Sequence, residues 1–206
     1  VELVKSGRRP SQLITREVLM NAIMFDMAVA GSTNAVLHIL SFSYELGIRL
    51  TLEDFEKYAK EIPCINAVVP SGPYTVVDFH YAGGVMNVMK MLESKLFTEV
   101  PGMYGVSWKE MLAKVTPREN EVIHSLERPL FQEPGLKILR GNLSPNGAIV
   151  RPTAVYDEVK YMRGKAKVFD GDRAAFEAIQ AGEIVPGDII VIRYEGCKGA
   201  PGMKEL

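Results

Sequence analysis

The sequence predicts an α/β protein in two parts, a mainly helical part over residues 1–132 and a small mixed β domain over residues 133–206. Two observations support this fold class. Apolar residues recur at helical spacing over residues 16–112, whereas short β-branched runs alternate with turn signals from residue 136 onward. A polar stretch, residues 116–132, joins the two parts. We therefore expect helices in the first part and short strands in the second.

The first helix is predicted from a cap and a buried stripe. Thr15 places a hydroxyl before the helix, and Glu17 puts a negative charge in its first turn. Leu19, Ile23 and Met27 follow at the spacing of one helical face. This face should be buried.

A second helix follows after a sharp polar turn. Gly31 interrupts the first helical pattern, and either Ser32 or Thr33 offers a hydroxyl N-cap for the next helix. That helix should run to about Glu45, where Gly47 ends it. The sequence thus predicts a helix, a turn of small polar residues and another helix.

Three more helix starts follow the capping-box pattern, in which a hydroxyl binds a free helical amide and an acidic side chain three positions on reaches back. The pairs are Thr51 with Asp54, Thr75 with Asp78, and Ser107 with Glu110. The second of these helices is broken by Gly83-Gly84, before an apolar helical pattern resumes over residues 85–96.

Short strands are expected beyond Pro134-Gly135. The β-rich runs, which turn residues separate, are residues 136–139, 148–150, 166–169 and 189–194. One helix interrupts them, with Asp172 as its cap and Gly182 as its terminator. These elements predict a small mixed β domain with one or two crossing helices.

Composition and charge disfavour several classes of protein. The chain has 206 residues, 47% of them hydrophobic and 24% charged, enough for one sizeable core or two modest ones. Twenty-four Lys and Arg residues oppose 25 Asp and Glu residues, without long runs of either sign, so we expect no nucleic-acid or membrane partner. Asp26 and Asn34 interrupt the longest apolar stretch, and Val1 begins no recognisable signal peptide. The cytoplasm is the expected location.

Neither the cysteines nor the histidines predict a catalytic centre. Cys64 and Cys197 are far apart and lack zinc-type spacing, and Cys64 is interpreted as a small buried hydrophobe. Cys197 lies beside a lysine on a glycine-rich loop, which favours the thiolate, although an incidental role is the simpler interpretation. His38 falls on an apolar helix and is expected in the core, whereas His80 and His124 are expected at the surface or in caps.

The turn before the second helix is the main candidate for ligand contact. Ser32, Thr33 and Asn34 offer two hydroxyls, an amide and exposed backbone amides at a helix start, all suited to an anionic substrate. Helix capping is the alternative role, and both roles are compatible. A glycine-rich loop near residue 205 also suggests backbone that approaches a charged ligand or metal.

Short motifs in order along nearly the whole chain resemble the dihydroxy-acid dehydratase family, which includes sugar-acid dehydratases. The motifs are Thr15-Arg16-Glu17 with Asn21-Ala22, residues 31–38, residues 50–55, Pro70-Ser71-Gly72, Ala82-Gly83-Gly84, residues 139–143, Val168-Phe169-Asp170 and residues 191–205. Several unrelated patterns at compatible spacings make this resemblance specific. It implies that the first part is a portion of an α/β domain and the second part the beginning of a β-barrel-like domain.

The resemblance also implies an activity, the dehydration of 2,3-dihydroxy acids to 2-keto acids. Family members hold an iron-sulfur cluster and a divalent cation, usually magnesium. A hard cation on the substrate carboxylate would stabilise enolate-like charge, and an open iron site would assist departure of the C3 hydroxyl group. The family's cluster cysteines precede the matched segment and its catalytic serine follows it, so we expect an internal fragment, inactive alone and without a catalytic residue of its own.

One metal ligand is implied within the chain. Glu205 ends a Pro-Gly-Met-x-Glu motif and is similar to the glutamate that binds the divalent cation in the family. Glu195 lies near that motif without matching it, and we interpret it as structural. Family members usually have glycine at position 30, so Ala30 suggests that the extra backbone freedom is not required there. Position 197 is usually proline, so Cys197 is a local departure.

Two classes of function remain open at this point. The first is an enzyme of branched-chain amino-acid biosynthesis acting on 2,3-dihydroxyisovalerate, with sugar-acid dehydration as a close variant. The second is a noncatalytic scaffold that keeps the fold. The resemblance also implies a homo-oligomer, either a dimer or a tetramer.

Overall fold

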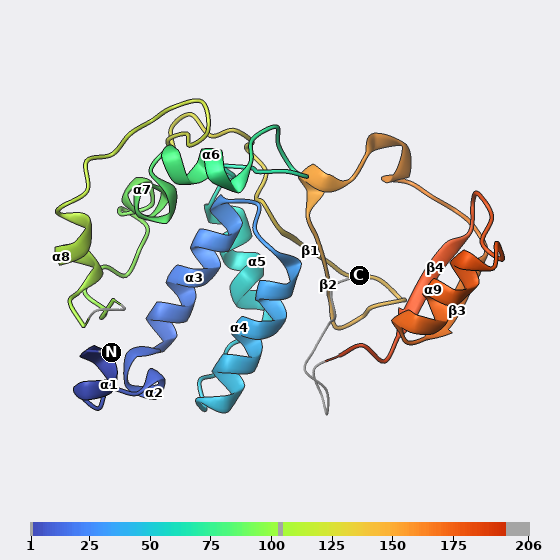
Figure 1. Ribbon diagram of the computed structural model, residues 1–206, viewed down its shortest axis with the longest axis horizontal. Coiled ribbons are helices and arrows are strands. Elements are labelled where there is room, and N and C mark those ends of the chain that lie inside the picture. Colours follow the sequence, from blue (N-terminus) through green and yellow to red (C-terminus); the bar gives the residue numbers. More distant parts are fainter. Residues whose placement is uncertain (1, 103–104, 197–206) are drawn as a thin grey trace. The chain divides into compact units, whose positions relative to one another are not determined.

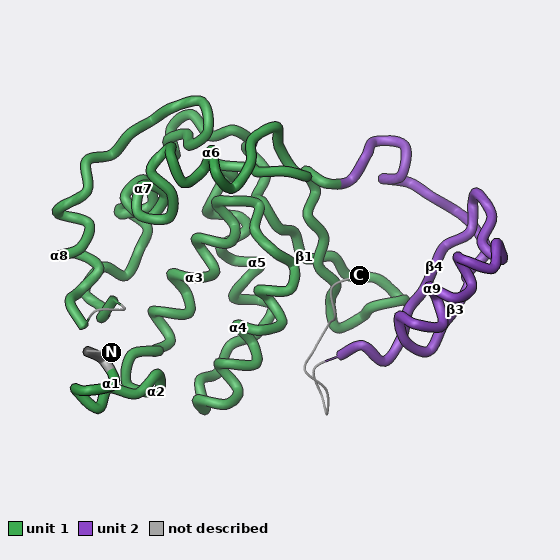
Figure 2. The backbone as a smooth tube through the Cα atoms, in the orientation of Figure 1, with its two compact units in different colours: residues 1–154 green, residues 155–206 purple. Residues whose placement is uncertain are grey.

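The computed structural model describes residues 2–102 and 105–196 and divides the chain into two compact units, residues 1–154 and 155–206 (Figures 1 and 2). Unit 1 contains α1 (Glu2–Lys5), α2 (Pro10–Leu13), α3 (Arg16–Ala28), α4 (Thr33–Glu45), α5 (Leu52–Glu61), α6 (Val76–Tyr81), α7 (Gly84–Met91), α8 (Trp108–Leu112), β1 (Lys137–Leu139), β2 (Ala148–Val150) and the 3-10 helix η1 (Pro152–Ala154). Unit 2 contains η2 (Asp157–Val159), β3 (Ala166–Asp170), α9 (Asp172–Gln180) and β4 (Ile189–Arg193).

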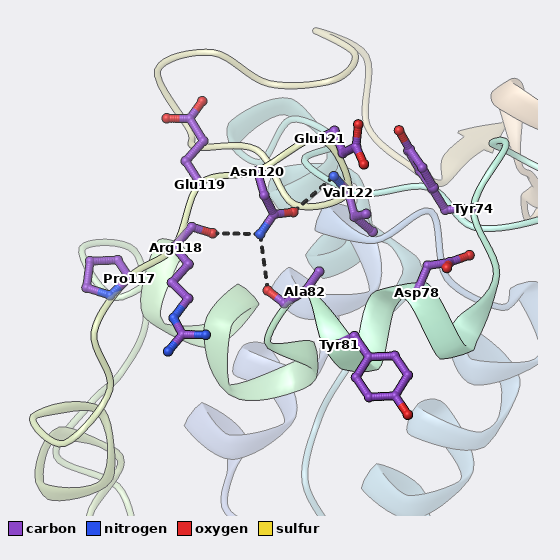
Figure 3. Close-up of a pocket in the computed structure, with 10 residues that line it drawn as sticks. All are labelled: Tyr74, Asp78, Tyr81, Ala82, Pro117, Arg118, Glu119, Asn120, Glu121 and Val122. Atoms are coloured by element: carbon purple, nitrogen blue, oxygen red, sulfur yellow. Dashed lines mark hydrogen bonds between the residues drawn. The ribbon is translucent and has the colours of Figure 1, made fainter.

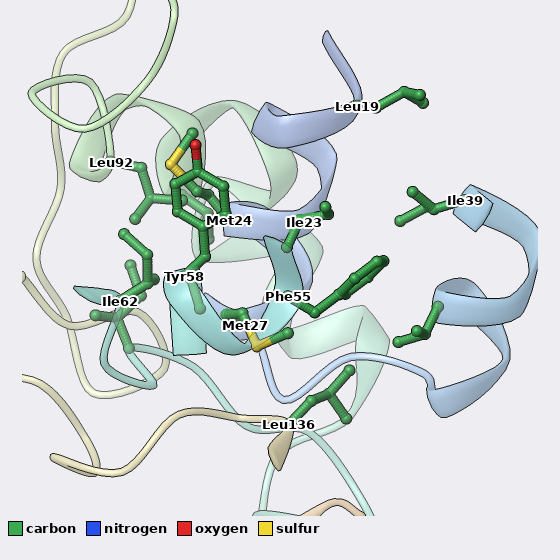
Figure 4. Close-up of a cluster of buried hydrophobic side chains, with 14 of the residues drawn as sticks. Leu19, Ile23, Met24, Met27, Ile39, Phe55, Tyr58, Ile62, Leu92 and Leu136 are labelled. Carbon is green, nitrogen blue, oxygen red and sulfur yellow. The ribbon is translucent and has the colours of Figure 1, made fainter. Parts of the chain in front are cut away.

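Helix α3 is the centre of unit 1, as its predicted buried stripe requires. The Thr15 hydroxyl accepts a hydrogen bond from the Val18 amide at 3.4 Å and so caps the helix. The predicted face is buried, and α3 packs against α4 and α5. Figure 4 shows Ile23 and Met27 of this face near Phe55 of α5. The resulting core fixes the C-terminal end of α3, where the candidate site lies.

The predicted helix starts of unit 1 are confirmed. Ser32 is the N-cap of α4, and Gly47 follows its end with a left-handed φ of 66°. Reciprocal capping boxes begin α5, α6 and α8 at the three predicted threonine and serine positions. Helix α7 begins at the predicted glycine pair, but it ends at Met91 rather than continuing through residue 96.

Two small sheets follow the helices, one in each unit. Strands β1 and β2 pair antiparallel from Lys137↔Val150 to Leu139↔Ala148. Strands β3 and β4 pair in parallel from Ala166↔Ile189 to Asp170↔Arg193, with α9 as the crossover between them. The fold class is therefore mixed α/β, with a helical first half and small sheets later. Within residues 2–102 and 105–196, the two two-stranded sheets do not close into a barrel.

Two local predictions are wrong. His38 is exposed on α4 rather than buried in the core, because the helix turns Val36 and Ile39 inward instead. Asp172 is the first helical residue of α9, and Gly171 is the N-cap. The carboxylate of Glu195 accepts a hydrogen bond from the Asp172 amide at 3.0 Å, which agrees with the structural role expected for Glu195.

Among the residues that the structure describes, the helices are too short or too polar to cross a membrane.

Candidate functional site

The α3–α4 turn brings together the three polar residues predicted to contact substrate. The Gly31 amide donates a hydrogen bond to the Asp26 carbonyl at 3.0 Å, which closes the end of α3. The Ser32 hydroxyl then accepts a hydrogen bond from the Asn34 amide at 3.2 Å and starts α4. Thr33 and Asn34 occupy the first turn of the new helix. The capping role of Ser32 is thus observed, while contact of these three residues with substrate stays a prediction.

Ala30 has a left-handed backbone conformation. The interpretation that position 30 does not require the extra backbone freedom of glycine is therefore wrong. Its φ is 47° and its side chain is buried. A residue with a Cβ is strained in this region by roughly 1–2 kcal/mol. Gly135 lies against the same backbone: its amide donates to the Met27 carbonyl at 2.9 Å, and a Cβ on it would overlap the main chain of Ala30. Close packing therefore holds the turn in a strained backbone conformation.

Asp26 is a buried carboxyl group at this turn, with only 6% of the residue exposed. Its Oδ1 lies so close to Gly31 that a Cβ there would overlap it, and its Oδ2 has no hydrogen-bond partner. Burial raises the pKa of Asp26 to about 7, although Arg151 and a hydrogen bond from the Ser32 backbone amide act in the opposite direction. The group therefore changes charge near neutral pH.

Arg151 comes from the segment after β2 and lies near Asp26. Its guanidinium Nη1 is 3.4 Å from the hydroxyl of buried Ser71, whereas its buried Nε has no partner. Thr153, in η1, also has a buried hydroxyl without a partner. Buried polar groups in native proteins are nearly always hydrogen-bonded. Asp26, Arg151 and Thr153 are thus three residues of unit 1 that each carry a buried polar atom without a partner.

An apolar cavity of about 540 Å³ lies beside the turn. Gly31, Ser32 and Asp26 form its border, and α3, α4, α7 and Trp108 supply the rest of its wall. The apolar lining residues are Val18, Ala22, Phe25, Val29, Ala35, Ile39, Val85, Met89 and Trp108. A cavity of this kind suits an aliphatic group next to a small number of polar contacts.

A larger cavity of about 690 Å³ lies between α6 and the polar stretch that follows α8 (Figure 3). The Asn120 amide donates to the carbonyls of Ala82 and Arg118 at 3.2 and 3.1 Å and so fixes one wall. Three carboxylates line this cavity, and each already has a partner: Asp78 binds Thr75, Glu119 binds Arg128, and Glu121 binds Tyr74. Burial, with Glu121 beside the ring, raises the pKa of Tyr74. We therefore regard this cavity as structural.

The described residues do not fit a metal or cluster site. In the ranges 2–102 and 105–196, groups of three His, Cys, Asp or Glu side chains that could hold a metal ion are absent. Cys64 is fully buried, its thiol donates to the Asn66 carbonyl at 3.1 Å, and burial raises its pKa to about 11. The expected structural role of Cys64 is confirmed. Cys197 and Glu205 lie outside the described residues, so a magnesium ligand at Glu205 stays a prediction.

Asp26, Ser71 and Arg151 were not predicted from the sequence as candidate site residues. A signal for Asp26 was available, because it lies three residues after Ile23 and so shares the buried face of α3. Ser71 belongs to a motif that was noted only for its resemblance. Arg151 carries no local signal, since its importance depends on a contact with residues far away in the chain.

Comparison with known proteins identifies the family. The model of the dihydroxy-acid/6-phosphogluconate dehydratase N-terminal domain matches residues 1–111, and that of the C-terminal domain matches residues 121–206. The chain belongs to the dihydroxy-acid/6-phosphogluconate dehydratase family. The proposed domain bounds, 1–132 and 133–206, stay a prediction.

Individual relatives are similar over the whole chain. The dihydroxy-acid dehydratase of Methanosarcina barkeri is 43% identical over 210 residues, which cover 100% of this chain and 38% of that protein. The dihydroxy-acid dehydratases of Geobacter sulfurreducens and Clostridium novyi are 42% and 41% identical over 100% of this chain, with 37% and 38% of their own lengths covered. The chain thus spans less than two fifths of the length of these curated relatives.

Proposed function

We propose that this chain forms part of a dihydroxy-acid dehydratase, a hydro-lyase that converts 2,3-dihydroxy acids such as 2,3-dihydroxyisovalerate to 2-keto acids in branched-chain amino-acid biosynthesis. The family membership and the dihydroxy-acid dehydratases among its relatives support this activity. The observation that carries the proposal is the α3–α4 turn, where Ser32, Thr33 and Asn34 begin a 13-residue helix beside an apolar cavity.

The start of α4 has the chemistry that an acid substrate requires. Helix N-termini attract anions, because backbone amides and the helix dipole both present positive charge there. The hydroxyls of Ser32 and Thr33 and the amide of Asn34 add neutral hydrogen-bonding groups. In the proposed role, these side chains hold the hydroxyl and carboxylate groups of the substrate, while the apolar cavity receives its branched aliphatic end.

Cofactors and assembly complete the proposal. An iron-sulfur cluster is bound by ligands outside this chain, and Glu205 contributes one oxygen ligand to Mg²⁺. The described residues lack such ligand sets, so no chemical step of the metals is assigned to them. In this proposal the second part of the chain belongs to a β-barrel-like domain, and the enzyme is a cytoplasmic homo-oligomer.

Sugar-acid dehydration is the close alternative, because the family model also covers 6-phosphogluconate dehydratases. A sugar acid carries hydroxyl groups along its whole chain, and the wall of the cavity beside Ser32 offers these groups few partners. The apolar wall therefore favours a branched aliphatic acid.

Keto-acid formation tests the proposal. The protein expressed from its own gene, prepared without oxygen and supplied with Mg²⁺, is assayed with 2,3-dihydroxyisovalerate and with arabinonate. We expect turnover of the first acid in preference to the second. Preference for arabinonate would replace the substrate assignment, and turnover of neither acid would favour a noncatalytic scaffold.

A matched pair of variants tests the role of the turn. Glycine is nearly as good an N-cap as serine, so Ser32→Gly removes the hydroxyl while leaving α4 stable within a few tenths of a kcal/mol. We expect kcat/KM to fall roughly 10-fold, as for the loss of one hydrogen bond to substrate. Ser41→Ala is the control, since that hydroxyl donates to the Leu37 carbonyl within the same helix. Equal kcat/KM for the two variants would remove Ser32 from the site.

A further inference from the structure

We infer that Trp108 is the specificity-determining residue of the apolar cavity beside the α3–α4 turn, and that it sets the length of the aliphatic tail that the cavity accepts. The feature behind this inference is the wall of the cavity, which has Gly31 and Ser32 at the turn and Trp108 in its apolar part. The inference deepens the proposed function and rests on it for the identity of the acid.

The cavity follows one face of α3. Its lining includes Val18, Ala22, Phe25 and Val29, which recur every three or four residues and so share a helical face. At 1.5 Å of rise per residue, the first and last of these residues are ~16 Å apart along the helix axis. The cavity, of about 540 Å³, therefore extends well away from the turn. An acid as small as 2,3-dihydroxyisovalerate, held at the turn, would fill only the near part.

Asn21 lies in the far part of the cavity wall and anchors a neighbouring segment of backbone. It lines the cavity, is 2% exposed, and lies ~12 Å before Val29 along the helix axis. Its amide donates a hydrogen bond to the Phe97 carbonyl at 3.0 Å, and its Oδ1 accepts one from the Phe97 amide at 2.9 Å. This reciprocal pair satisfies a buried side chain and fixes the chain at Phe97.

The segment after Phe97 holds the start of α8. The Thr98 carbonyl accepts a hydrogen bond from the Lys109 amide at 2.8 Å, and the Val100 carbonyl accepts one from the Trp108 amide at 3.1 Å. Trp108 is the first residue of α8, so these contacts fix its backbone directly. Asn21 is thus a positioning residue, which acts on Trp108 through the anchored segment.

The indole ring can act as a stop for an aliphatic tail. Trp108 is partly buried and lines the cavity, and indole is the largest and among the most rigid of side chains. Each methylene that leaves water contributes about 0.8 kcal/mol, which is roughly 4-fold in affinity. Affinity should therefore rise with tail length until the tail reaches the ring, and then rise no further, because a close-packed wall resists added volume.

Fluorescence of Trp108 tests binding in the cavity directly, because this residue is the only tryptophan in the sequence. The probes are butanoate, hexanoate and octanoate, each titrated into the 206-residue chain. We expect a saturable change in emission, with affinity that rises roughly 4-fold per methylene until the tail reaches the ring. Emission that does not respond saturably, or affinity that is independent of tail length, would overturn the inference.

A matched pair of aromatic variants tests the stop itself, with calorimetry as the measurement. Trp108→Leu leaves room for about two more methylenes, so the ratio of the affinities for octanoate and butanoate should rise roughly 10-fold. Tyr44→Leu is the control, because Tyr44 is 81% exposed on α4 and lies outside the cavity wall; it should leave the ratio unchanged. Circular dichroism establishes that both variants are folded. Equal ratios for the two variants would contradict the role of Trp108.

Two buried asparagines separate positioning from a merely structural role. Asn87 is also 2% exposed, and it forms the same reciprocal pair with the backbone of Arg118, at 2.8 and 3.0 Å. Asn21→Asp and Asn87→Asp both keep the side-chain shape and lose the amide donor, so both should lower stability. Only Asn21→Asp should shift the Trp108 emission to longer wavelength and raise the octanoate-to-butanoate ratio, by roughly 4-fold, as for one added methylene.

The same emission and ratio in both asparagine variants would remove Asn21 from the inference, and the Trp108→Leu comparison decides the matter if Asn21→Asp does not fold. Failure of the inference and failure of the proposed function are distinguishable. Keto-acid formation with a tail-length preference that Trp108→Leu does not change removes only the inference. Binding that depends on tail length and on Trp108, without keto-acid formation, removes only the function.

Discussion

The α3–α4 turn of unit 1 and the β3–α9–β4 arrangement of unit 2 place acidic side chains in opposite environments. In unit 1, Asp26 is 6% exposed, has an unpartnered oxygen and lies near Arg151. In unit 2, the side chain of Asp170 is 60% exposed and its Oδ1 forms an ion pair with Arg193 at 2.7 Å. An exposed pair adds little to stability and costs little, whereas a buried carboxyl group is expensive. The burial of Asp26 is therefore a property of unit 1 that stability alone does not explain.

The two units also differ in the residues that form their hydrophobic cores. The main hydrophobic cluster of unit 1 surrounds α3 and contains fully buried Phe55. The buried hydrophobic residues of the described part of unit 2 are Ala175 and Ala178, while Phe176 is 53% exposed. The core of unit 1 is thus closely packed and includes the buried carboxyl group of Asp26. A binding site is expected to lie on such a packed element. Matched substitutions in the two units should expose this contrast.

The largest difference should appear between two phenylalanines. Phe55→Ala leaves a cavity in the core of unit 1 and should lower the free energy of unfolding by about 3–5 kcal/mol. Phe176→Ala removes a half-exposed ring and should cost less than about 1 kcal/mol. Urea unfolding followed by circular dichroism measures both. Similar losses for the two variants would show that the units are packed to the same degree.

The pH dependence of stability should distinguish two aspartates. Burial raises the folded-state pKa of Asp26 from 3.8 to about 7, so between these values the folded chain holds a proton that the unfolded chain releases. The free energy of unfolding should therefore fall with rising pH from about 4 to about 7, by up to ~1.4 kcal/mol per pH unit from this group.

The Asp26→Asn variant should lack that contribution, so that its stability relative to the wild type increases over the same pH range. Asp170→Asn is the control and should lose at most about 1 kcal/mol, because its pair is exposed. Urea unfolding at several pH values provides the comparison. Parallel pH profiles for wild type and Asp26→Asn would contradict the raised pKa.

Two glycines test how closely the turn is packed. Gly135→Ala places a Cβ on the main chain of Ala30 and 2.6 Å from the Met27 carbonyl, so it should cost about 1–3 kcal/mol. Gly141→Ala meets open space and should leave the free energy of unfolding nearly unchanged. A Gly135→Ala variant as stable as Gly141→Ala would show that the turn has room to move.

The smallest effect should come from the strained alanine. Ala30→Gly relieves the left-handed backbone and loses a buried methyl group, and these changes should offset each other to within about 1 kcal/mol. Ala59→Gly in the interior of α5 has no strain to relieve and should cost about 1 kcal/mol. Thermal unfolding of both variants makes the comparison. A larger loss for Ala30→Gly would show that the methyl contact outweighs the strain.

Local features of the fold were predictable because their causes are local. The hydroxyl and carboxyl groups of a capping box lie three residues apart, so Thr51, Thr75 and Ser107 could be identified without a structure. The short strands were predicted to within about two residues, from β-branched runs between turn signals. The three polar residues at the start of α4 were identified for the same reason.

The remaining features depend on packing between distant parts of the chain. The left-handed Ala30 is fixed by Gly135, and the environment of Asp26 depends on Arg151. His38 was placed in the core from an apolar pattern, but the rotation of α4 is set by its contacts with α3. Periodicity predicts that a helix has a buried face and leaves the exact boundary of that face open.

The most direct test of this account is a map of amide chemical shifts during titration of the 206-residue chain with 2,3-dihydroxyisovalerate at pH 6. The account predicts that the largest changes occur at the start of α4 and at the residues that line the apolar cavity beside it, with little change in β3, α9 and β4. Largest changes in unit 2, or in the cavity lined by Tyr74 and Glu121, would contradict it.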